Sequence, residues 1–416
     1  MKTVAIIGSG ISGLSCAYLL KNHYTVHLYE KNSYFGGHSN TIDINVEGKI
    51  IPVDTGFIVF NERTYPNLIG LFKSLHIETT KSDMSFGVTL KERALEYSGS
   101  SIDQFFAQKK NLFKPSFWIM GLDIIRFNKA ALEANEESLK DLTLENFINQ
   151  LKLSQYFKDH YLYPMAGAIW STDAKEVGAF PAQIFIRFFK NHGLLTLTDH
   201  PQWYSVKNGS RQYVEKIIKQ KGIQSHANQG IKHVVRDQGK TILIMEDGSE
   251  IPYDKVIFAT PAHKTLLLLK DPTPQEKIIL SSFKYSKNIA YVHCDESLMP
   301  QNKKAWASWA YSDQSHTGVN ITYWMNNLQN LETGKNIFVT LNPKSRPAKD
   351  LTFRVLNYEH PIFDQNAINA QDQIHTLHGH KNTYFTGAYQ RYGFHEDGIW
   401  SAVNVVKKIG VKIPWA

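Results

Sequence analysis

The sequence predicts an α/β fold in which a buried parallel sheet holds a nucleotide, and three observations lead to this prediction. Val4–Ile7 is a continuous apolar run of strand length, as in a parallel strand that is buried on both faces. A Gly-x-Gly-x-x-Gly motif at residues 8–13 follows and leads into apolar residues at near-helical spacing. A second apolar run, Thr25–Tyr29, ends at Glu30. This order of strand, turn, helix, strand and acid is typical of a dinucleotide-binding βαβ unit.

Each glycine of the motif has a separate physical task in such a unit. Gly8 permits the tight turn, Gly10 lets the backbone approach a pyrophosphate, and Gly13 allows close packing of helix and strand. Ile11 and Ser12 lie in the first helical turn, so we expect their N–H groups to face the phosphates.

The acid and a second glycine pair extend the expected nucleotide site. Glu30 lies where a carboxylate accepts hydrogen bonds from ribose hydroxyls, and Lys31 follows it. Gly36-Gly37-His38 comes six residues after Glu30. Three further residues, at the end of another apolar run, complete the set of candidates in this part of the chain: Asp54, Thr55 and Gly56.

The composition describes an ordinary globular protein of about two domains. The chain has 416 residues, too many for one compact core. Only two cysteines are present, which favours a reducing compartment. Neither a secretory signal nor an apolar run long enough to span a bilayer is evident, so we expect a cytoplasmic protein. The net charge of +8 is spread along the chain, and no nucleic-acid-binding module accompanies it, so we expect no nucleic-acid partner.

The second glycine turn resembles that of the flavoproteins of the amine oxidase and phytoene desaturase superfamily. In that superfamily the segment passes the pyrophosphate of FAD, and an Arg often stands where this chain has His38. The stretch that ends in Ala259-Thr260 resembles the strand and turn that return to the cofactor, and the resemblance implies an adenine contact near Val234. The segment from Tyr384 onward resembles the strand whose glycine, here Gly387, meets the ribityl chain. An apolar helix is expected over residues 399–409. The resemblance implies that its N-terminus faces the flavin pyrimidine edge with these residues: Asp397, Gly398 and Ile399.

This conjunction implies FAD as cofactor and a discontinuous fold. We expect a Rossmann-like FAD-binding domain formed by residues 1–80, 200–265 and 375–416. An inserted α+β substrate domain, as in amine oxidases, is expected to comprise residues 81–199, mostly helical, and 266–374. A second Gly-x-Gly-x-x-Gly motif is not present, which argues against a separate NAD(P)H domain.

The stretches "NIFVTLNP" (336–343) and "GAYQRYGFHEDGIWSA" (387–402) resemble a narrower bacterial group of oxidoreductases. Its members are associated with cyclopropane-fatty-acid synthase and related lipid methyltransferases. The resemblance implies a lipid or fatty-acyl substrate, dehydrogenation of a modified acyl chain with hydride transfer to flavin N5, and a lipid methyltransferase as partner. We interpret His395 as the first candidate for the base, with Glu396 as its competitor and Tyr392 lining the pocket. Glu396 and Asp397 have the alternative role of acids at a helix N-terminus.

Three other functions stay open at this point. An amine oxidase is the first, with Lys287 as a conceivable match to the lysine near flavin N5. The second is a flavin-dependent fatty-acid isomerase, and the third is a non-catalytic FAD-binding partner of a lipid methyltransferase. The histidines show no metal-ligand spacing, so we predict no metal site.

Two segments of the first insertion have alternative interpretations. In residues 105–134, apolar and aromatic side chains crowd together with Lys and Arg beside them, which fits a buried helical hairpin or a peripheral contact with the inner membrane surface. In residues 161–171, small residues and aromatics fit a narrow apolar pocket or close helix packing.

Overall fold

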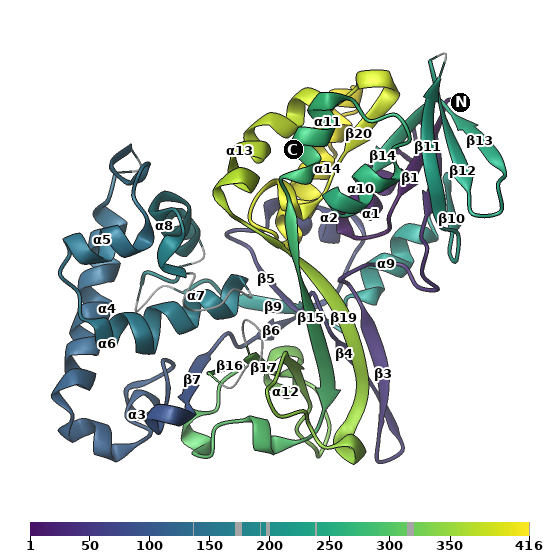
Figure 1. The fold of residues 1–416 in the computed structure, drawn as a ribbon. Helices are drawn as coiled ribbons and strands as arrows, with labels where there is room; N and C mark the ends of the chain where they lie inside the picture. The colour runs from purple at the N-terminus through teal and green to yellow at the C-terminus, as the bar shows by residue number, and fades with distance from the viewer. Residues whose placement is uncertain are drawn as a thin grey trace.

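The computed structural model describes residues 1–135, 137–170, 177–191, 193–196, 200–237, 239–313 and 320–415. Two halves lie side by side, a nucleotide-binding half built on a five-stranded sheet and a half that combines a seven-stranded sheet with a helical lobe (Figure 1). Ser171, the last residue of the expected apolar pocket, lies outside the described residues.

The five-stranded sheet is parallel throughout and has the order β10-β2-β1-β14-β20. Side chains of β1 alternate between its faces: Val4 and Ile6 contact one apolar cluster, whereas Ala5 and Ile7 contact another. Both faces are therefore buried, as the uninterrupted apolar run predicts. The strands are β1 (Thr3–Ile7), β2 (Thr25–Tyr29), β10 (Ile223–His226), β14 (Lys255–Phe258) and β20 (Thr383–Phe385).

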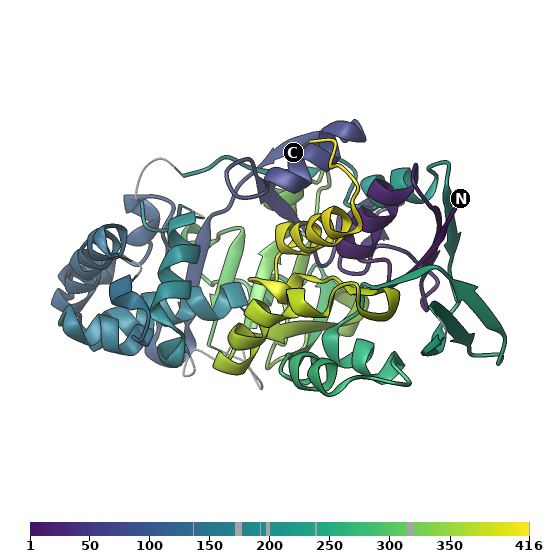
Figure 2. The ribbon, with the colours of Figure 1, turned by 90° about the horizontal axis from the view of Figure 1, so that it is seen from above.

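One face of this sheet is covered by helices whose apolar residues form a single cluster with the strands. Helices α1 and α14 lie against each other on this face (Figure 2). The helices are α1 (Ile11–Leu20), α2 (Pro66–Ser74), α9 (Arg211–Ile218) and α14 (His395–Ile409).

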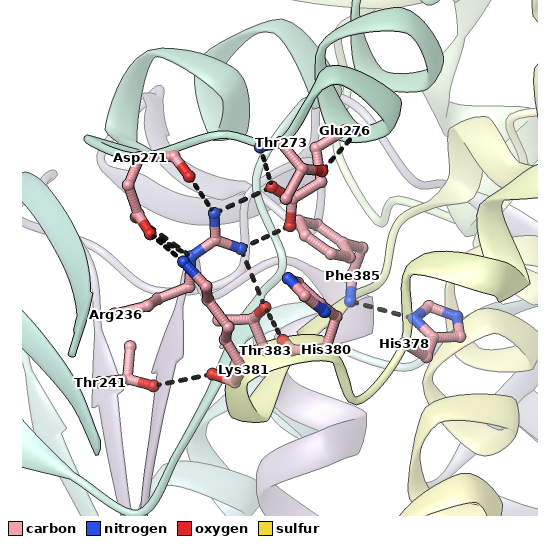
Figure 3. Close-up of polar contacts among 10 residues, drawn as sticks. All are labelled: Arg236, Thr241, Asp271, Thr273, Glu276, His378, His380, Lys381, Thr383 and Phe385. Carbon is pink, nitrogen blue, oxygen red and sulfur yellow. Dashed lines mark hydrogen bonds and ion pairs between the residues drawn. The ribbon is translucent and has the colours of Figure 1, made fainter. Parts of the chain in front are cut away.

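The opposite face is covered by an antiparallel three-stranded sheet and three helices. They are β11 (Ile231–Asp237), β12 (Lys240–Met245), β13 (Glu250–Tyr253), α10 (Ala262–Leu268), α11 (Pro274–Ser281) and α13 (Gln365–Gln373). Arg236 on β11 joins these elements, because its guanidinium donates to Glu276 of α11 at 2.9 Å and to Asp271 at 3.1 Å (Figure 3). Lys381, next to β20, also binds Asp271 at 2.9 Å.

The seven-stranded sheet of the other half has the order β19-β15-β18-β17-β16-β7-β8. The long pair β15 and β19 runs from the nucleotide-binding half into this sheet (Figure 1). All neighbouring strands are antiparallel except β7 and β16. The strands are β7 (Phe86–Leu90), β8 (Leu95–Ser98), β15 (Lys284–His293), β16 (Trp309–Ser312), β17 (Asn320–Trp324), β18 (Phe338–Leu341) and β19 (Thr352–Ile362).

The helical lobe packs on one face of the seven-stranded sheet and shares a large apolar cluster with it. Its helices are α3 (Ile102–Phe105), α4 (Pro115–Glu133), α5 (Leu144–Gln150), α6 (Gln155–Phe157), α7 (Tyr163–Trp170) and α8 (Ala182–Asn191). Smaller elements complete the described fold: β3 (Thr41–Val46), β4 (Lys49–Asp54), β5 (Val59–Asn61), β6 (Thr79–Ser82), β9 (Trp203–Val206) and α12 (Met325–Gln329).

The structure corrects three expectations about the elements. Helices α11 and α13 fall within the expected substrate segment but pack on the nucleotide-binding sheet. The reason is that their apolar residues form one cluster with those of β1 and β14. The segment 81–199 begins with two strands, β7 and β8, before it becomes helical. The last helix begins at His395 and not at Ile399, since the polar residues 395–398 form its first turn.

Candidate functional site

The candidate site begins at the carboxyl ends of the parallel strands. Ile7 is in register with Tyr29 and Phe258, and Phe258 is in register with Phe385. The segments that follow these strands therefore leave the sheet at one edge, where open α/β sheets bind their ligands. Four of the predicted cofactor segments meet there: Gly8–Gly13, Glu30, Ala259-Thr260 and Gly387.

The first glycine turn has the geometry that its sequence predicts. Gly8 has φ +102°, and a Cβ placed there would lie 2.7 Å from the carbonyl oxygen of Ala259. A Cβ on Gly13 would lie 1.9 Å from the carbonyl oxygen of Gly8, so helix α1 touches the turn itself. A Cβ on Gly10 would meet no atom within 4 Å and would point into open space. Gly10 thus keeps clear the position where a pyrophosphate meets the helix N-terminus formed by Ile11 and Ser12.

The second glycine turn lies directly on the first. Gly37, at φ +60°, would place a Cβ 3.0 Å from the Cα of Gly10. The N–H of Gly36 donates to the hydroxyl of Ser9 at 3.2 Å. Gly56 would place a Cβ 2.4 Å from the carbonyl oxygen of His38, so its segment also needs glycine for close backbone approach.

Glu30 stands at the end of β2, as predicted, and its carboxylate is oriented by neighbouring protein groups. It is buried and accepts hydrogen bonds from the Ser9 hydroxyl at 2.7 Å and from the Asn32 N–H at 2.9 Å. Lys31, the next residue, is exposed. Ser9, which lies in the first glycine turn, thus connects Glu30 to the second turn as well.

The C-terminal segment brings a second helix N-terminus to the same edge. A Cβ on Gly398 would lie 2.6 Å from Cγ2 of Ile11 and 2.9 Å from the Ser12 hydroxyl. Helices α1 and α14 therefore touch at their first turns, where their dipoles favour negative charge. Ile399 is fully buried in the same cluster as α1. Thr260 binds the Thr265 hydroxyl at 2.8 Å, and Gly387 donates its N–H to the Ser401 hydroxyl at 2.9 Å.

Several predicted cofactor residues have side chains or backbone atoms that are bound within the protein. Both carboxylate oxygens of Asp54 accept from the N–H of Ser210, at 2.9 and 3.0 Å, and the Ser210 hydroxyl donates at 2.7 Å. Burial raises the pKa of Asp54 to about 6, although these hydrogen bonds lower it. Asp54 therefore binds the start of α9. Its carboxylate is occupied there and is not oriented toward a cofactor. Ser210 stands at the N-cap of α9, and its hydroxyl donates to Asp54 instead of accepting from the helix backbone.

Two further candidate residues also make hydrogen bonds within the protein. Thr55 donates its hydroxyl to the Asn40 carbonyl at 2.7 Å. Val234 is fully buried, and its carbonyl accepts from the Lys270 N–H at 3.0 Å. Its expected adenine contact stays a prediction.

His395 lies in an enclosed environment beside the second glycine turn. Its Nε2 is hydrogen-bonded to the Ser39 hydroxyl at 2.8 Å and to the Tyr213 hydroxyl at 2.9 Å. Its ring stacks on Phe57 at a centroid distance of 3.7 Å. Burial holds the pKa of His395 well below its usual range. This setting does not suit a catalytic base, because Nε2 is occupied and the ring has a low affinity for protons.

Glu396 and Asp397 take the helix-terminal role that we weighed as an alternative. Glu396 accepts from the backbone N–H groups of Asn67 at 3.1 Å and Leu68 at 3.0 Å, at the start of α2. Asp397 accepts from the N–H of Phe394 at 2.9 Å. Burial raises the pKa of both carboxyls, that of Asp397 to about 7. With a pKa of about 7, Asp397 carries less negative charge at neutral pH than an exposed aspartate does.

A cavity of about 410 Å³ lies where α14 meets the loop before α2 and the end of α8. It therefore lies between the nucleotide-binding half and the helical lobe, a common place for a ligand site. Tyr392, Glu396 and Asp397 line it, whereas His395 is not among the described residues that do. The other lining residues include three cations and several aromatics: Arg63, Lys190, Arg391, Tyr65, Phe394 and Trp400.

The site fits FAD on two observations. The open space above Gly10 matches the position of a pyrophosphate. In addition, Nε2 of His38 is buried and has no hydrogen-bond partner among the described residues. Burial lowers the pKa of His38 to about 4, so its ring is neutral and can offer one N–H or one lone pair to a ligand. Among the described residues, no three His, Cys, Asp or Glu side chains form a group suited to a metal ion.

This fold and site define an FAD-dependent oxidoreductase. The chain belongs to the family of flavin-containing amine oxidoreductases, whose model matches residues 11–397. The chain is similar in structure to a fatty acid isomerase from P. acnes that produces CLA, with TM-score 0.69, 13% identity and 99% of each chain covered. It is also similar to a triple mutant of putrescine oxidase, with TM-score 0.67, 13% identity and 98% of each chain covered. Cyclohexylamine oxidase from Brevibacterium oxydans matches with TM-score 0.65 and 13% identity, over 98% of this chain and 99% of that one. No curated protein sequence matches the chain significantly.

Sequence reasoning missed most of the cavity. Arg63, Lys190 and Trp400 were not singled out, because they stand in three unrelated segments without a motif. Ser9 was missed as well, although its place between two motif glycines could have drawn attention to it. The conceivable lysine of an amine oxidase, Lys287, is exposed on β15.

Proposed function

We propose that this enzyme oxidises an acyl chain that carries an anionic end, by dehydrogenation with FAD as the acceptor. The observation that carries the proposal is the charge of the cavity beside α14. Three cations line it, from the loop before α2, from the end of α8 and from the turn before α14: Arg63, Lys190 and Arg391. The N-terminal ends of α2 and α14 also face it, and helix dipoles add positive potential there.

Arg391 is held in place for such a role. Its guanidinium carbon lies 4.8 Å from the ring centroid of Trp400 and 5.4 Å from that of Tyr392. Its Nε lies 3.8 Å from Asp397. A guanidinium between two aromatic rings loses little freedom when it binds a carboxylate or phosphate, and it can bind such a group in bidentate fashion.

The same cavity is a poor site for a protonated amine. The two acids in its lining, Glu396 and Asp397, are bound to helix ends and have raised pKa values. A cationic substrate would therefore meet three cations, and Asp397, with a pKa of about 7, is only partly charged at neutral pH. Lys287 is exposed, which also favours a substrate other than an amine. The structural neighbours include a fatty acid isomerase and amine oxidases, so they do not decide between the two substrate classes. The cavity lining is the better guide to the substrate of this chain.

The residues of this chain have positioning and binding roles in the proposed reaction. FAD, when bound, supplies the acceptor for the hydride. Arg63, Lys190 and Arg391 bind the anionic end, and the rings of Tyr65, Tyr392 and Phe394 contact the acyl chain. His395, stacked on Phe57, supports the cofactor edge, and its enclosed setting does not suit the role of base that the sequence suggested. The expected lipid methyltransferase partner also stays a prediction.

The test is an anaerobic titration of the yellow holoenzyme, followed at the flavin absorbance band. Free fatty acids with and without methyl or cyclopropane branches form one arm, acidic phospholipids with the same chains form another, and a panel of primary amines forms the third. Lasting bleaching by one of the lipid arms supports the proposal and identifies the anionic end as carboxylate or phosphate. Bleaching by amines alone would overturn it. Bleaching that reverses without an added oxidant would indicate an isomerase.

Arg391→Gln provides the residue-level test. Loss of a charge-assisted hydrogen bond of about 1.5–3 kcal/mol predicts a rise in KM for the acyl substrate of roughly 10- to 150-fold, with retention of FAD. Lys407→Gln is the matched control, because Lys407 is exposed at the far end of α14. An unchanged KM in Arg391→Gln would remove the anionic-end interaction from the proposal.

A further inference from the structure

An apolar surface is exposed on the helical lobe, along α3, the turn before α4, and α4 itself. Phe113 is 87% exposed, Leu122 61% and Trp118 50%. We name this surface the α4 patch and define it by its exposed apolar residues: Ile102, Leu112, Phe113, Trp118, Ile119, Leu122, Ile125 and Leu132. Exposed apolar patches of this extent usually mark an interaction site.

Helix α4 is apolar on two opposite sides, which packing within the chain does not require. Its inner side, with Phe117, Met120 and Phe127, belongs to the core of the helical lobe. The outer stripe has Trp118, Leu122, Ile125 and Leu132, spaced by four, three and seven residues, so they share one face. From Trp118 to Leu132 the stripe is about 21 Å long, and it can lie flat against a surface.

Basic side chains surround this stripe. Lys109 and Lys110 precede α4 and are exposed, Lys114 stands at its N-cap, and Lys129 is exposed within the stripe. Of the three acids of residues 102–133, two are engaged with basic side chains, and the third, Glu133, is exposed at the C-terminal end of α4. Asp103 pairs with Lys304 at 2.9 Å, and Asp123 is buried, where it binds Arg126 at 2.9 Å.

This combination fits a lipid surface better than a protein surface. Interfaces between proteins are depleted in lysine, whereas helices that lie in a membrane interface combine Trp, Phe and Leu with flanking lysines. Lysine side chains near a bilayer are attracted by anionic headgroups. Trp118 is also pre-positioned, because its indole N–H donates to the Leu112 carbonyl at 2.9 Å and its ring contacts Phe106 at a centroid distance of 4.9 Å.

We propose that the α4 patch docks the protein on an anionic lipid bilayer, with α4 parallel to the membrane plane. Phe113, Trp118 and Leu122 insert among the acyl chains, and the lysines bind the headgroups. The patch lies at the end of the molecule away from the five-stranded sheet, so the nucleotide-binding half faces the solvent (Figures 1 and 2). Among the described residues, no helix is long and apolar enough to cross a bilayer, which leaves docking in the interface. This inference does not depend on the proposed substrate.

Flotation of the holoenzyme with vesicles tests the proposal. One set consists of phosphatidylcholine alone, and the other contains roughly one third phosphatidylglycerol. We expect the protein to float with the anionic vesicles. High salt should release the variant in which the apolar contacts are weakened, because that variant depends on the lysines alone. Phe113→Ser/Leu122→Ser should lower the partition coefficient at least tenfold. The triple change of Lys109, Lys110 and Lys114 to Gln should lower it roughly hundredfold, at about fivefold for each lysine.

The matched control is Leu267→Ser/Ile278→Ser, because these two residues are equally exposed apolar positions on α10 and α11. It should float like the parent protein. Circular dichroism should show nearly unchanged melting for all variants, since the substituted side chains are exposed except Lys114, which is partly buried. Equal flotation of parent and Phe113→Ser/Leu122→Ser would overturn the proposal. So would a dimer in light scattering that Phe113→Ser/Leu122→Ser converts to monomer, because the patch would then contact a second copy of the chain.

Discussion

Replacing Arg236 with methionine tests how the two layers on the far side of the nucleotide-binding sheet are joined. The guanidinium of Arg236 is fully buried, and the Glu276 side chain that it binds is 1% exposed. In Arg236→Met the Glu276 carboxylate keeps the N–H of Thr273 at 2.8 Å but loses its counter-charge. Asp271 keeps Lys381 at 2.9 Å, so the unpaired charge is that of Glu276 (Figure 3).

Breaking a buried ion pair from one side costs about 3–5 kcal/mol, because the remaining charge is desolvated without compensation. With an unfolding entropy of about 2.1 cal/mol/K per residue, this loss lowers the Tm of the chain of 416 residues by about 3–6 °C. Thermal unfolding followed by circular dichroism measures the change. Arg236→Met/Glu276→Leu should recover most of the lost Tm, since an apolar pair of similar volume has no charge to desolvate.

The pH dependence gives an independent check. Burial alone would raise the pKa of Glu276, but the hydrogen bonds from Arg236 and Thr273 outweigh it and the pKa is lowered. The stabilisation by this group is therefore present above pH 4.5 or so, and it is lost as the pH falls through the folded-state pKa. A Tm of Arg236→Met within about 1 °C of the parent at pH 7 would refute the reasoning, because it would mean that Glu276 finds another partner or is protonated.

Three further predictions concern the cofactor edge. Gly10→Ala should fold with an unchanged apoprotein Tm but bind FAD at least tenfold more weakly, and an FAD affinity equal to that of the parent would contradict this. Gly13→Ala should fail to fold, because its Cβ would lie 1.9 Å from the Gly8 carbonyl oxygen. The raised pKa of Asp397, about 7, means that its contribution to stability is complete below pH 4 or so and is lost as the pH rises through 7. Asp397→Asn should therefore remove roughly 2.5 kcal/mol of the decline in unfolding free energy between pH 5 and pH 8, measured by urea unfolding, and an equal decline in the two proteins would disprove it. His395→Ala should lower the free energy of unfolding by about 1–3 kcal/mol, because stacking and hydrogen bonds are lost. The FAD-bound variant should keep kcat within tenfold of the parent, and a fall in kcat of several hundredfold would indicate that His395 is the base.

The nucleotide-binding edge is the part of the site that could be predicted from the sequence. Strands β1 and β2, the conformation of Gly8 and the position of Glu30 depend on neighbouring residues, because turn geometry and strand burial are local properties. The order of the later segments added Ala259 and Gly387 through resemblance to a known family. Flavin as cofactor followed from that order and not from any single motif.

The start of α14 shows where local patterns were insufficient. An apolar period predicts a helix only from Ile399, because the preceding His-Glu-Asp-Gly residues have no apolar face. In the structure these residues form the first turn because Glu396 binds the start of α2 and Asp397 binds the Phe394 N–H. Both partners are polar groups that the sequence pattern does not pair.

The sequence by itself determined the class of fold and the positions of the glycine turns, since these depend on backbone freedom or periodicity within a few residues. It also determined the cofactor, through the order of segments that resembles a known family. Only the tertiary structure decided that Arg63, Lys190 and Arg391 line one cavity, and that α4 leaves a second apolar side uncovered. The physical reason is that charge convergence and exposure depend on how distant segments pack. That packing is set by the whole apolar core and not by the residues that form the site.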